Sequence, residues 1–333
     1  MATFKNLTVD DTGYIQIPSG TTAQRPASPV EGMMRYNTTL GYNEYYNGTS
    51  WVGANISYTP PNGSSSGTAA LSALDILYNY PSSSDGVYWI NLPTVGATQI
   101  YCIMNTPYNG GGWMMGMKAA NTGTTFSYSA TYWTTINTLN PSDNTRNNAD
   151  AKFNTFNYFG AKDIMAVWPD IATATYGAGS ISGVSEWTWL ENSFNNGTRQ
   201  TLTGFFTTPS NRTYTSPTFG GSGYFIKDAK TFGGWKSGVF SSQTDIRFYG
   251  FNYISYQGNN YAHNAKVRWG FGWNENGEGL FPSNNVQYIG SNDISGGIGM
   301  DSSYGSYSAG DKINCCQDTT GINRQARVEI YLR

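Results

Sequence analysis

Charge and histidine are scarce in this sequence, and both shortages exclude classes of function. Only 12% of the 333 residues are charged and the formal net charge is -2, so the chain offers no basic field that would attract nucleic acid. The single histidine, His263, makes a His-based zinc site or a Ser-His-Asp triad difficult to build. We therefore expect no nucleic-acid partner and no catalytic residues, and we interpret His263 as structural.

Long apolar runs and paired cysteines are missing as well. No run approaches the length of a transmembrane helix, and the first residues, MATFKNLTVDD, do not form a secretory signal. The three cysteines, Cys102, Cys315 and Cys316, are too few for a disulfide framework, as expected of a protein made under reducing conditions. Cys315 and Cys316 are either two thiols, which we favour, or a strained vicinal disulfide. We expect synthesis in the cytoplasm and no membrane insertion.

The sequence is rich instead in aromatic and small polar residues. Hydrophobic residues make up 38% and aromatic residues 15% of the chain, enough to bury a substantial core, and the length predicts about two domains. With so little charge, the surface must consist mainly of Asn, Thr, Ser, Gly and Tyr. Such a surface suits glycan contact or tight assembly.

Residues 1–55 alternate short strand-like runs with turn residues and predict a small β module. A module of this size is difficult to stabilise alone, so we expect it to self-associate or to attach to a larger body. The motifs QRP at 24–26, EGMMRYN at 31–37 and YNGTSW at 46–51 resemble a short β module near the ends of tailed-phage fibre and virion structural proteins. The resemblance covers 17–52 and implies trimerisation or attachment to other virion proteins.

The candidate association residues of this module combine charge with flat aromatic surface. We expect Arg25 and Arg35 to form ion pairs with Glu31 between copies, while the aromatic rings pack against a partner. The candidates are Arg25, Glu31, Arg35, Tyr36, Tyr45 and Trp51. For each of them, packing within one chain is the open alternative.

A linker over 56–69 separates the module from the rest of the chain. Its sequence TPPNGSSSGT predicts a connector that is stiff at the prolines and flexible afterwards. The following residues, 69–77, predict a short helix that carries Leu71, Leu74 and Leu77 along one side. We expect the core of the second domain to begin here.

The segment 85–117 predicts a hairpin followed by a buried strand. Apolar runs at 87–92 and 99–104 flank a turn at 93–97, which is typical of a hairpin. The glycines at 110–112 permit backbone conformations that other residues avoid, and the apolar residues at 113–117 predict a buried strand.

Three blocks of sequence resemble the fibrinogen-like superfamily, and within it the intelectin branch of calcium-dependent lectins, over roughly residues 70–333. The blocks are DGVY at 85–88 with YCIM at 101–104 and GGGW at 110–113; DAKFN at 150–154 with AKDI at 161–164; and WN at 273–274 with GEGLFP at 277–282 and VEIYLR at 328–333. The resemblance implies a mainly β fold with an α+β C-terminal domain of the fibrinogen type. In secreted relatives the counterpart of Cys102 pairs with a cysteine near the preceding helix, which has none here, so we expect Cys102 to be a buried free thiol.

The resemblance also implies a calcium ion that binds vicinal diols of sugars. Asn274 and Asp293 match or lie near ligands of the family, but the ligand histidine has no counterpart and Ser283 replaces the ligand glutamate. Oxygen atoms of neighbouring side chains are the replacements that calcium would accept. The candidate calcium ligands are Asn259, Asn260, Asn274, Glu275, Glu278 and Asp293; the candidate glycan-binding residues are Trp273, Asn274, Glu275, Glu278, Tyr288 and Asp293.

Two alternatives remain open at this stage. The polar residues of 274–293 are also typical of side chains that cap turns in a Gly-rich loop. A second oxygen-rich segment, 142–150, suits either a structural calcium or Asx turns without a metal.

These observations predict a phage tail fibre or capsid-decoration protein that is displayed on the virion, trimerises, and adheres to host-surface polysaccharide, with calcium as a cofactor. The rival prediction is a purely structural decoration protein without a sugar site. A depolymerase is a third class, for which the open Gly-rich loop offers no buried carboxylate pair.

Overall fold

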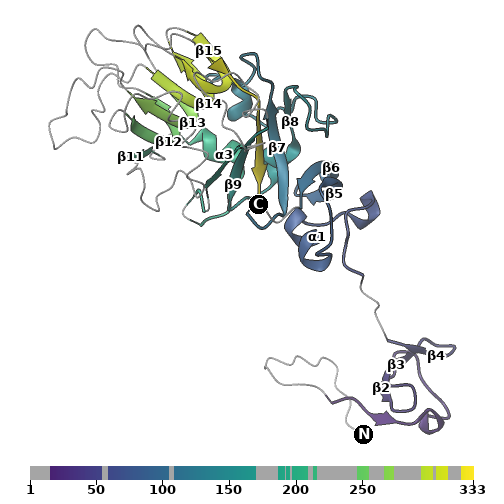
Figure 1. Cartoon of the computed structure of the whole chain (residues 1–333). Helices are drawn as coiled ribbons and strands as arrows, with labels where there is room; N and C mark the ends of the chain where they lie inside the picture. Colours follow the sequence, from purple (N-terminus) through teal and green to yellow (C-terminus); the bar gives the residue numbers. More distant parts are fainter. Residues whose placement is uncertain are drawn as a thin grey trace. The chain divides into compact units, whose positions relative to one another are not determined.

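The computed structural model describes residues 16–54, 59–104, 109–169, 187–191, 193–195, 197–208, 213–215, 246–254, 266–273, 294–302, 305–313 and 324–333. The chain divides into two compact units, Met1–Pro60 and Pro61–Arg333 (Figure 1). Strands dominate both units, which confirms the prediction of a mainly β fold.

The first unit contains a four-stranded sheet in the order β1-β2-β3-β4. Its elements are β1 (Ser19–Gly20), the 3-10 turn η1 (Thr22–Gln24), β2 (Met34–Asn37), β3 (Tyr42–Tyr46) and β4 (Trp51–Gly53). β1 runs parallel to β2, whereas β2, β3 and β4 form antiparallel pairs. Gly41 and Gly48 lie in the two connecting turns with φ of 77° and 92°, a region that glycine enters without steric cost.

The second unit contains two larger sheets and several short helices. The first seven strands are β5 (Gly86–Leu92), β6 (Gly96–Ile103), β7 (Trp113–Ala119), β8 (Ala151–Lys152), β9 (Ile164–Trp168), β10 (Trp187–Glu191) and β11 (Thr213–Thr215). The remaining strands are β12 (Ile246–Ile254), β13 (Lys266–Trp273), β14 (Ile294–Ser302), β15 (Gly305–Ile313), β16 (Arg324–Gln325) and β17 (Val328–Leu332). The helical segments are η2 (Ser66–Thr68), α1 (Ala73–Asn79), η3 (Thr131–Trp133), α2 (Asn154–Tyr158) and α3 (Leu202–Thr207).

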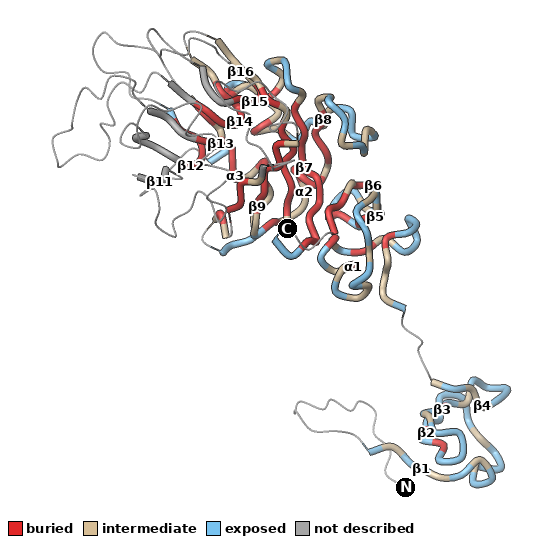
Figure 2. The backbone as a smooth tube through the Cα atoms, viewed as in Figure 1, coloured by how far each residue is buried: buried red, intermediate tan, exposed pale blue. Residues whose placement is uncertain are grey.

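The seven-stranded sheet has the order β10-β9-β17-β7-β6-β5, with β8 paired to β7. Every residue of β7, β9 and β17 is buried, and Figure 2 shows these strands in red. The six-stranded sheet has the order β11-β12-β13-β14-β15-β16, and its successive strands are antiparallel neighbours.

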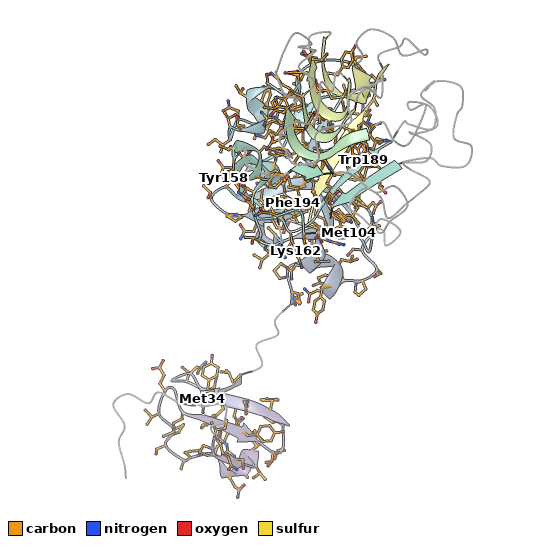
Figure 3. All side chains as sticks on the ribbon, turned by 90° about the vertical axis from the view of Figure 1, so that its left-hand side faces the viewer. Met34, Met104, Tyr158, Lys162, Trp189 and Phe194 are labelled. Atoms are coloured by element: carbon orange, nitrogen blue, oxygen red, sulfur yellow. The ribbon has the colours of Figure 1, made fainter. Side chains whose placement is uncertain are left out.

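An aromatic core joins side chains from both sheets. The ring of Trp269 on β13 stacks on Phe251 of β12 at 5.4 Å and meets Trp189 of β10 edge-on at 6.0 Å. Trp189 and Phe194, both labelled in Figure 3, belong to this same buried cluster. Trp269 is therefore a core residue.

The predicted features of 85–117 are confirmed. β5 and β6 form the expected antiparallel hairpin, and β7 is buried throughout. The three glycines before β7 have φ of 89°, 71° and 76°. A Cβ on Gly112 would come within 2.9 Å of the Leu74 backbone, so α1 packs against bare backbone here. Cys102 is buried and free, as predicted.

The predicted connector and helix need correction. The backbone of Gly63 bonds with Thr68 and Trp89, and Ala70 bonds with β5, so this part of the expected linker packs in the second unit. The helix begins at Ala73, after Leu71, because Ser72 caps it by accepting a hydrogen bond from the Asp75 backbone. Its buried residues are Ala73 and Ile76, whereas Leu74 is exposed.

Candidate functional site

The predicted glycan and calcium site lies almost entirely outside the described residues. Trp273 ends β13, and only its backbone is described; the other candidates, Asn259, Asn260, Asn274, Glu275, Glu278, Tyr288 and Asp293, lie outside the described ranges. His263, Cys315 and Cys316 do as well.

The described strand ends show where the two site segments attach. Trp273 of β13 pairs with Ile294 of β14, so both ends of segment 274–293 join neighbouring strands at one end of the sheet. Ile254 of β12 pairs with Lys266 at the other end of β13, and segment 255–265, which contains Asn259 and Asn260, joins the sheet there. The predicted calcium ligands thus belong to two segments that leave opposite ends of β13.

A polar cluster around Arg268 of β13 lies on the six-stranded sheet, and the sequence did not predict it. The Arg268 guanidinium donates to the Tyr128 carbonyl at 2.7 Å and to Asn252 Oδ1 at 2.8 Å, and it lies 4.1 Å from the centre of the Tyr128 ring. Asn252 has a φ of 53°, which is costly for a non-glycine residue within a strand, and its Nδ2 has no hydrogen-bond partner among the described residues. No sequence signal marks Asn252, because its contacts depend on a backbone conformation that asparagine adopts only occasionally.

The second oxygen-rich segment, 142–150, closes around a lysine. The side chain of Lys118 on β7 is fully buried, and its Nζ contacts three oxygens: Asp143 Oδ2 at 2.8 Å, the Thr145 carbonyl at 2.7 Å and Asn147 Oδ1 at 2.5 Å. Asp150 accepts hydrogen bonds from the backbone of Ala120 and from Thr125. An ammonium group therefore occupies the centre of the segment that we considered for a structural calcium.

Within the part of the chain that the structure describes, no group of three or more His, Cys, Asp or Glu side chains is arranged to hold a metal ion. Among the same residues, no helix is both long and apolar enough to cross a bilayer.

A buried charge network fixes the same segment to β17. Glu329 has no exposed side-chain surface; it accepts from Arg146 Nε at 2.7 Å, from Arg327 Nη2 at 2.6 Å and from the Tyr331 hydroxyl at 2.8 Å. Burial, reinforced by the charge of Glu329, raises the pKa of Tyr331 well above its ordinary value. Because Glu329 also sits opposite Lys118 in the β17-β7 register, the 143–147 segment is held against two adjacent strands.

In the first unit, the arginines have partners within one chain, which is the alternative that the sequence left open. Arg25 Nη2 lies 2.5 Å and Arg35 Nε 3.5 Å from carboxylate oxygens of Glu44, and Asn37 donates to the same carboxylate at 3.0 Å. Arg25 also lies over the Trp51 ring, 5.8 Å from its centroid. Arg25, Arg35 and Trp51 thus make contacts within one chain, whereas Glu31 is exposed.

Glu44 is the residue that the sequence interpretation missed. The hydrogen bond from Arg25 is the largest effect on this carboxylate and, with help from Asn37 and Arg35, lowers its pKa. The signal was present, because alternation within YNEYY places Glu44 on the face opposite Tyr45, and the tight turn at 38–41 sets it across from Arg35.

The opposite face of this sheet is mainly apolar and largely exposed, with the polar Asn43 paired to Tyr36. Met34 pairs with Tyr45, which pairs in turn with Val52, and Tyr36 lies on the same face. The exposed fractions of Met34, Tyr36 and Tyr45 are 52%, 38% and 39%. We call Met34, Tyr36, Tyr45 and Val52 the outer face.

The polarity of the first unit is therefore inverted. In residues 16–54 the buried positions are Arg35, Asn37 and Glu44, and no hydrophobic side chain among them is buried. Figure 2 shows the consequence as a tube that is mostly exposed or intermediate, and Met34 is labelled in Figure 3.

A scan against protein-family models finds no match to this chain, and a search of curated proteins finds no significant relative.

Proposed function

We propose that this chain is a tailed-phage virion appendage, a fibre or capsid-decorating protein, that adheres to a host-surface glycan. Its first unit attaches or trimerises, and its second unit is a fibrinogen-like domain of the intelectin type. The protein acts as a binder rather than as an enzyme. It is made in the host cytoplasm and displayed on the particle surface.

The inverted polarity of the first unit is the observation that carries this proposal. A unit of fewer than 60 residues gains little stability from burial when its described residues enclose only polar groups. Covering the outer face with a second and third copy of the chain removes apolar surface from water at about 25 cal/mol per Å². We therefore place the association surface at Met34, Tyr36, Tyr45 and Val52, of which Tyr36 and Tyr45 are among the original candidates.

The seven-stranded sheet supports the proposed fold family of the second unit. The opening block of the resemblance forms β5, β6 and β7, the middle block leads into β9, and the closing block forms β17. These strands are neighbours in one sheet, in the order β9-β17-β7-β6-β5, although the blocks are far apart in the sequence. The sequence blocks that resemble one family therefore also lie in one sheet.

Many copies per particle would compensate for weak binding by a single sugar site. Linked sites raise the effective concentration of the second binding event, and avidity exceeds single-site affinity by about 10²–10⁴-fold. An association module joined to a binding domain is an arrangement that uses this effect.

A glycan array probed with the full chain, with and without a calcium chelator, tests the proposal. We expect binding to a host polysaccharide that the chelator abolishes. The double variant Asn274→Ala/Asp293→Ala should lose binding, and Asn259→Ala/Asn260→Ala tests whether the segment at the other end of β13 contributes. Failure to bind any host polysaccharide in either condition would refute adhesion.

The rival function is structural decoration without a sugar site. The missing histidine and the serine at position 283 favour it, since both remove calcium ligands of the intelectin family. In that case the array shows no binding to any glycan, while the protein still self-associates and is still incorporated into particles. A depolymerase would instead release reducing ends from the polysaccharide during long incubation.

A further inference from the structure

Three side chains around the 143–147 segment bring together a nucleophile, an amide and a carboxylate. Lys118 Nζ lies 2.5 Å from Asn147 Oδ1 and 2.8 Å from Asp143 Oδ2. Asn147 Nδ2 donates to both oxygens of the same Asp143 carboxylate, at 3.2 and 3.1 Å. Asp143 thus contacts both the amine and the amide nitrogen.

The distance from the amine to the amide carbon is tightly limited. A C=O bond is about 1.2 Å long, so a nitrogen 2.5 Å from Oδ1 lies no farther than about 3.7 Å from Cγ. This limit is close to the separation of about 3–3.5 Å at which held groups react as if at very high concentration.

The surroundings keep these groups in place. Lys118 lies on β7 with no exposed side-chain surface. Thr145 holds the Asp143 carboxylate through a hydrogen bond of 2.7 Å from its hydroxyl, and Arg146 fastens the segment to Glu329 at 2.7 Å. These contacts hold the segment where the amine already meets the amide oxygen.

We propose that Lys118 and Asn147 form an intramolecular isopeptide bond, with Asp143 as the proton carrier. This cross-link would join the centre of the seven-stranded sheet to the 143–147 segment. It is independent of glycan binding, and nothing in the proposed function requires it.

The reaction balances without an oxidant or a second substrate. Asp143 takes a proton from the Lys118 ammonium, and the free amine attacks Cγ of Asn147, so that the Nζ–Cγ bond forms. Asp143 then gives that proton to Nδ2 as the Cγ–Nδ2 bond breaks. Of the two protons still on Nζ, one passes through Asp143 to the leaving ammonia, which departs as ammonium, and the other remains on the isopeptide nitrogen.

Asp143 is charged in the resting state, as a proton acceptor must be. Burial alone would raise its pKa, but the hydrogen bonds from Lys118, Thr145 and Asn147 outweigh burial and lower the pKa to about 2. Asp143 therefore starts deprotonated and can accept a proton. Proton transfer by a positioned side chain contributes about 10²–10⁴-fold to a rate, most effectively when its pKa lies near the operating pH.

The decisive experiment is peptide mapping of the denatured full-length protein by mass spectrometry. We expect one branched peptide in which Lys118 is joined to Asn147, with the mass of one ammonia lost. Because succinimide formation at any asparagine also releases ammonia, the branched peptide rather than the intact mass decides the question. Separate, unmodified peptides for the two residues would overturn the proposal, as would deamidation of Asn147 alone.

Matched variants test each role. Lys118→Arg keeps the positive charge but removes the amine nucleophile, and Asn147→Ala removes the acceptor; both should abolish the branched peptide. Asn148→Ala changes the adjacent exposed asparagine, which bonds with Asn121, and should leave the branched peptide unchanged. Asp143→Asn should slow its appearance at least about 100-fold. An unchanged rate in Asp143→Asn would overturn the role of Asp143. The peptide map of the wild-type protein tests the cross-link itself even if a variant does not fold.

Discussion

At the scale of single residues, two buried lysines of the second unit differ in what their ammonium groups contact. Lys118 meets three oxygens, including a carboxylate. Lys152 donates to the Thr135 carbonyl at 2.6 Å and lies 4.7 Å from the centre of the Phe156 ring, and no described carboxylate forms an ion pair with it. Burial therefore lowers the pKa of Lys152 to about 7.

This lowered pKa predicts a pH-dependent difference between wild type and Lys152→Met. Below about pH 7 both folded and unfolded states carry the proton, so the burial penalty is fully present in the wild type. Between that pH and the ordinary lysine pKa the folded state has lost the proton and the penalty shrinks. We expect Lys152→Met to be more stable by about 1–3 kcal/mol at pH 6, and this advantage to disappear near pH 10.

Urea denaturation of both proteins at several pH values measures this difference. Comparing the two proteins cancels the effect of groups that both proteins share, such as Cys102 and Tyr331, whose pKa values burial raises in the folded state. A difference in unfolding free energy that stays constant from pH 6 to pH 10 would show that Lys152 does not titrate as described.

A second prediction at this scale concerns Glu44. Its lowered pKa means that its stabilising effect is present above the ordinary carboxyl pKa and is lost as the pH falls through the folded value. At neutral pH, Glu44→Gln should weaken self-association of the full chain. Acidification should weaken self-association of the wild type through Glu44, and this part of the pH dependence should be absent in Glu44→Gln. Sedimentation at pH 7 and under acidic conditions would test this, and identical profiles for the two proteins would contradict it.

At the scale of elements, α1 packs tightly against the glycine turn before β7. Gly112 and Gly96 have nearly the same φ, 76° and 74°, but very different surroundings. A Cβ on Gly112 would approach Leu74 to 2.9 Å, whereas one on Gly96 would have nothing within 4 Å.

These two glycines form a matched pair for mutation. Gly96→Ala should cost only the backbone strain of a left-handed residue, about 1–2 kcal/mol. Gly112→Ala adds a clash with α1 and should cost about 2 kcal/mol more, since overpacking a tight site costs about 1–3 kcal/mol. Thermal unfolding of both variants gives the comparison, and equal losses would mean that α1 moves freely away from β7.

The outer face of the first sheet gives the next prediction. Tyr45→Asp places a charge at the centre of this face and should weaken self-association at least about tenfold, because a desolvated charge without a partner is costly. Thr49→Asp, in the exposed turn before β4, is the matched control and should associate like the wild type. Light scattering over a range of concentrations distinguishes them; association by Tyr45→Asp at wild-type strength would exclude this face.

Local pattern predicted much of this fold but few of its polar contacts. The hairpin of β5 and β6 and the glycine turn follow from residues that are close in sequence, whereas the buried free Cys102 is expected from the family resemblance. Glu44 with Arg25 and Lys118 with Asn147 meet across 19 and 29 residues, and such pairings depend on how loops close. The predicted sugar site remains a prediction, because its side chains lie outside the described residues.

At the scale of the whole molecule, the two units have opposite distributions of polarity. The second unit buries an aromatic core, whereas the described residues of the first enclose charges and expose apolar side chains. We therefore expect 61–333 alone to unfold cooperatively as a monomer and the full chain to associate. If binding is multivalent, 61–333 should also bind glycan surfaces about 100-fold more weakly. Calorimetry and surface binding of both proteins test this, and a self-associating 61–333 would contradict it.

The position of β17 has a kinetic consequence. This strand pairs with β7 on one side and β9 on the other, although both precede it by a large part of the chain. During synthesis, each of them therefore has an open edge until the ribosome has produced residues 328–332. Pairings between distant segments form slowly, and open strand edges invite aggregation in the meantime. The yield of soluble protein should thus depend on chaperones that shield these edges during the delay.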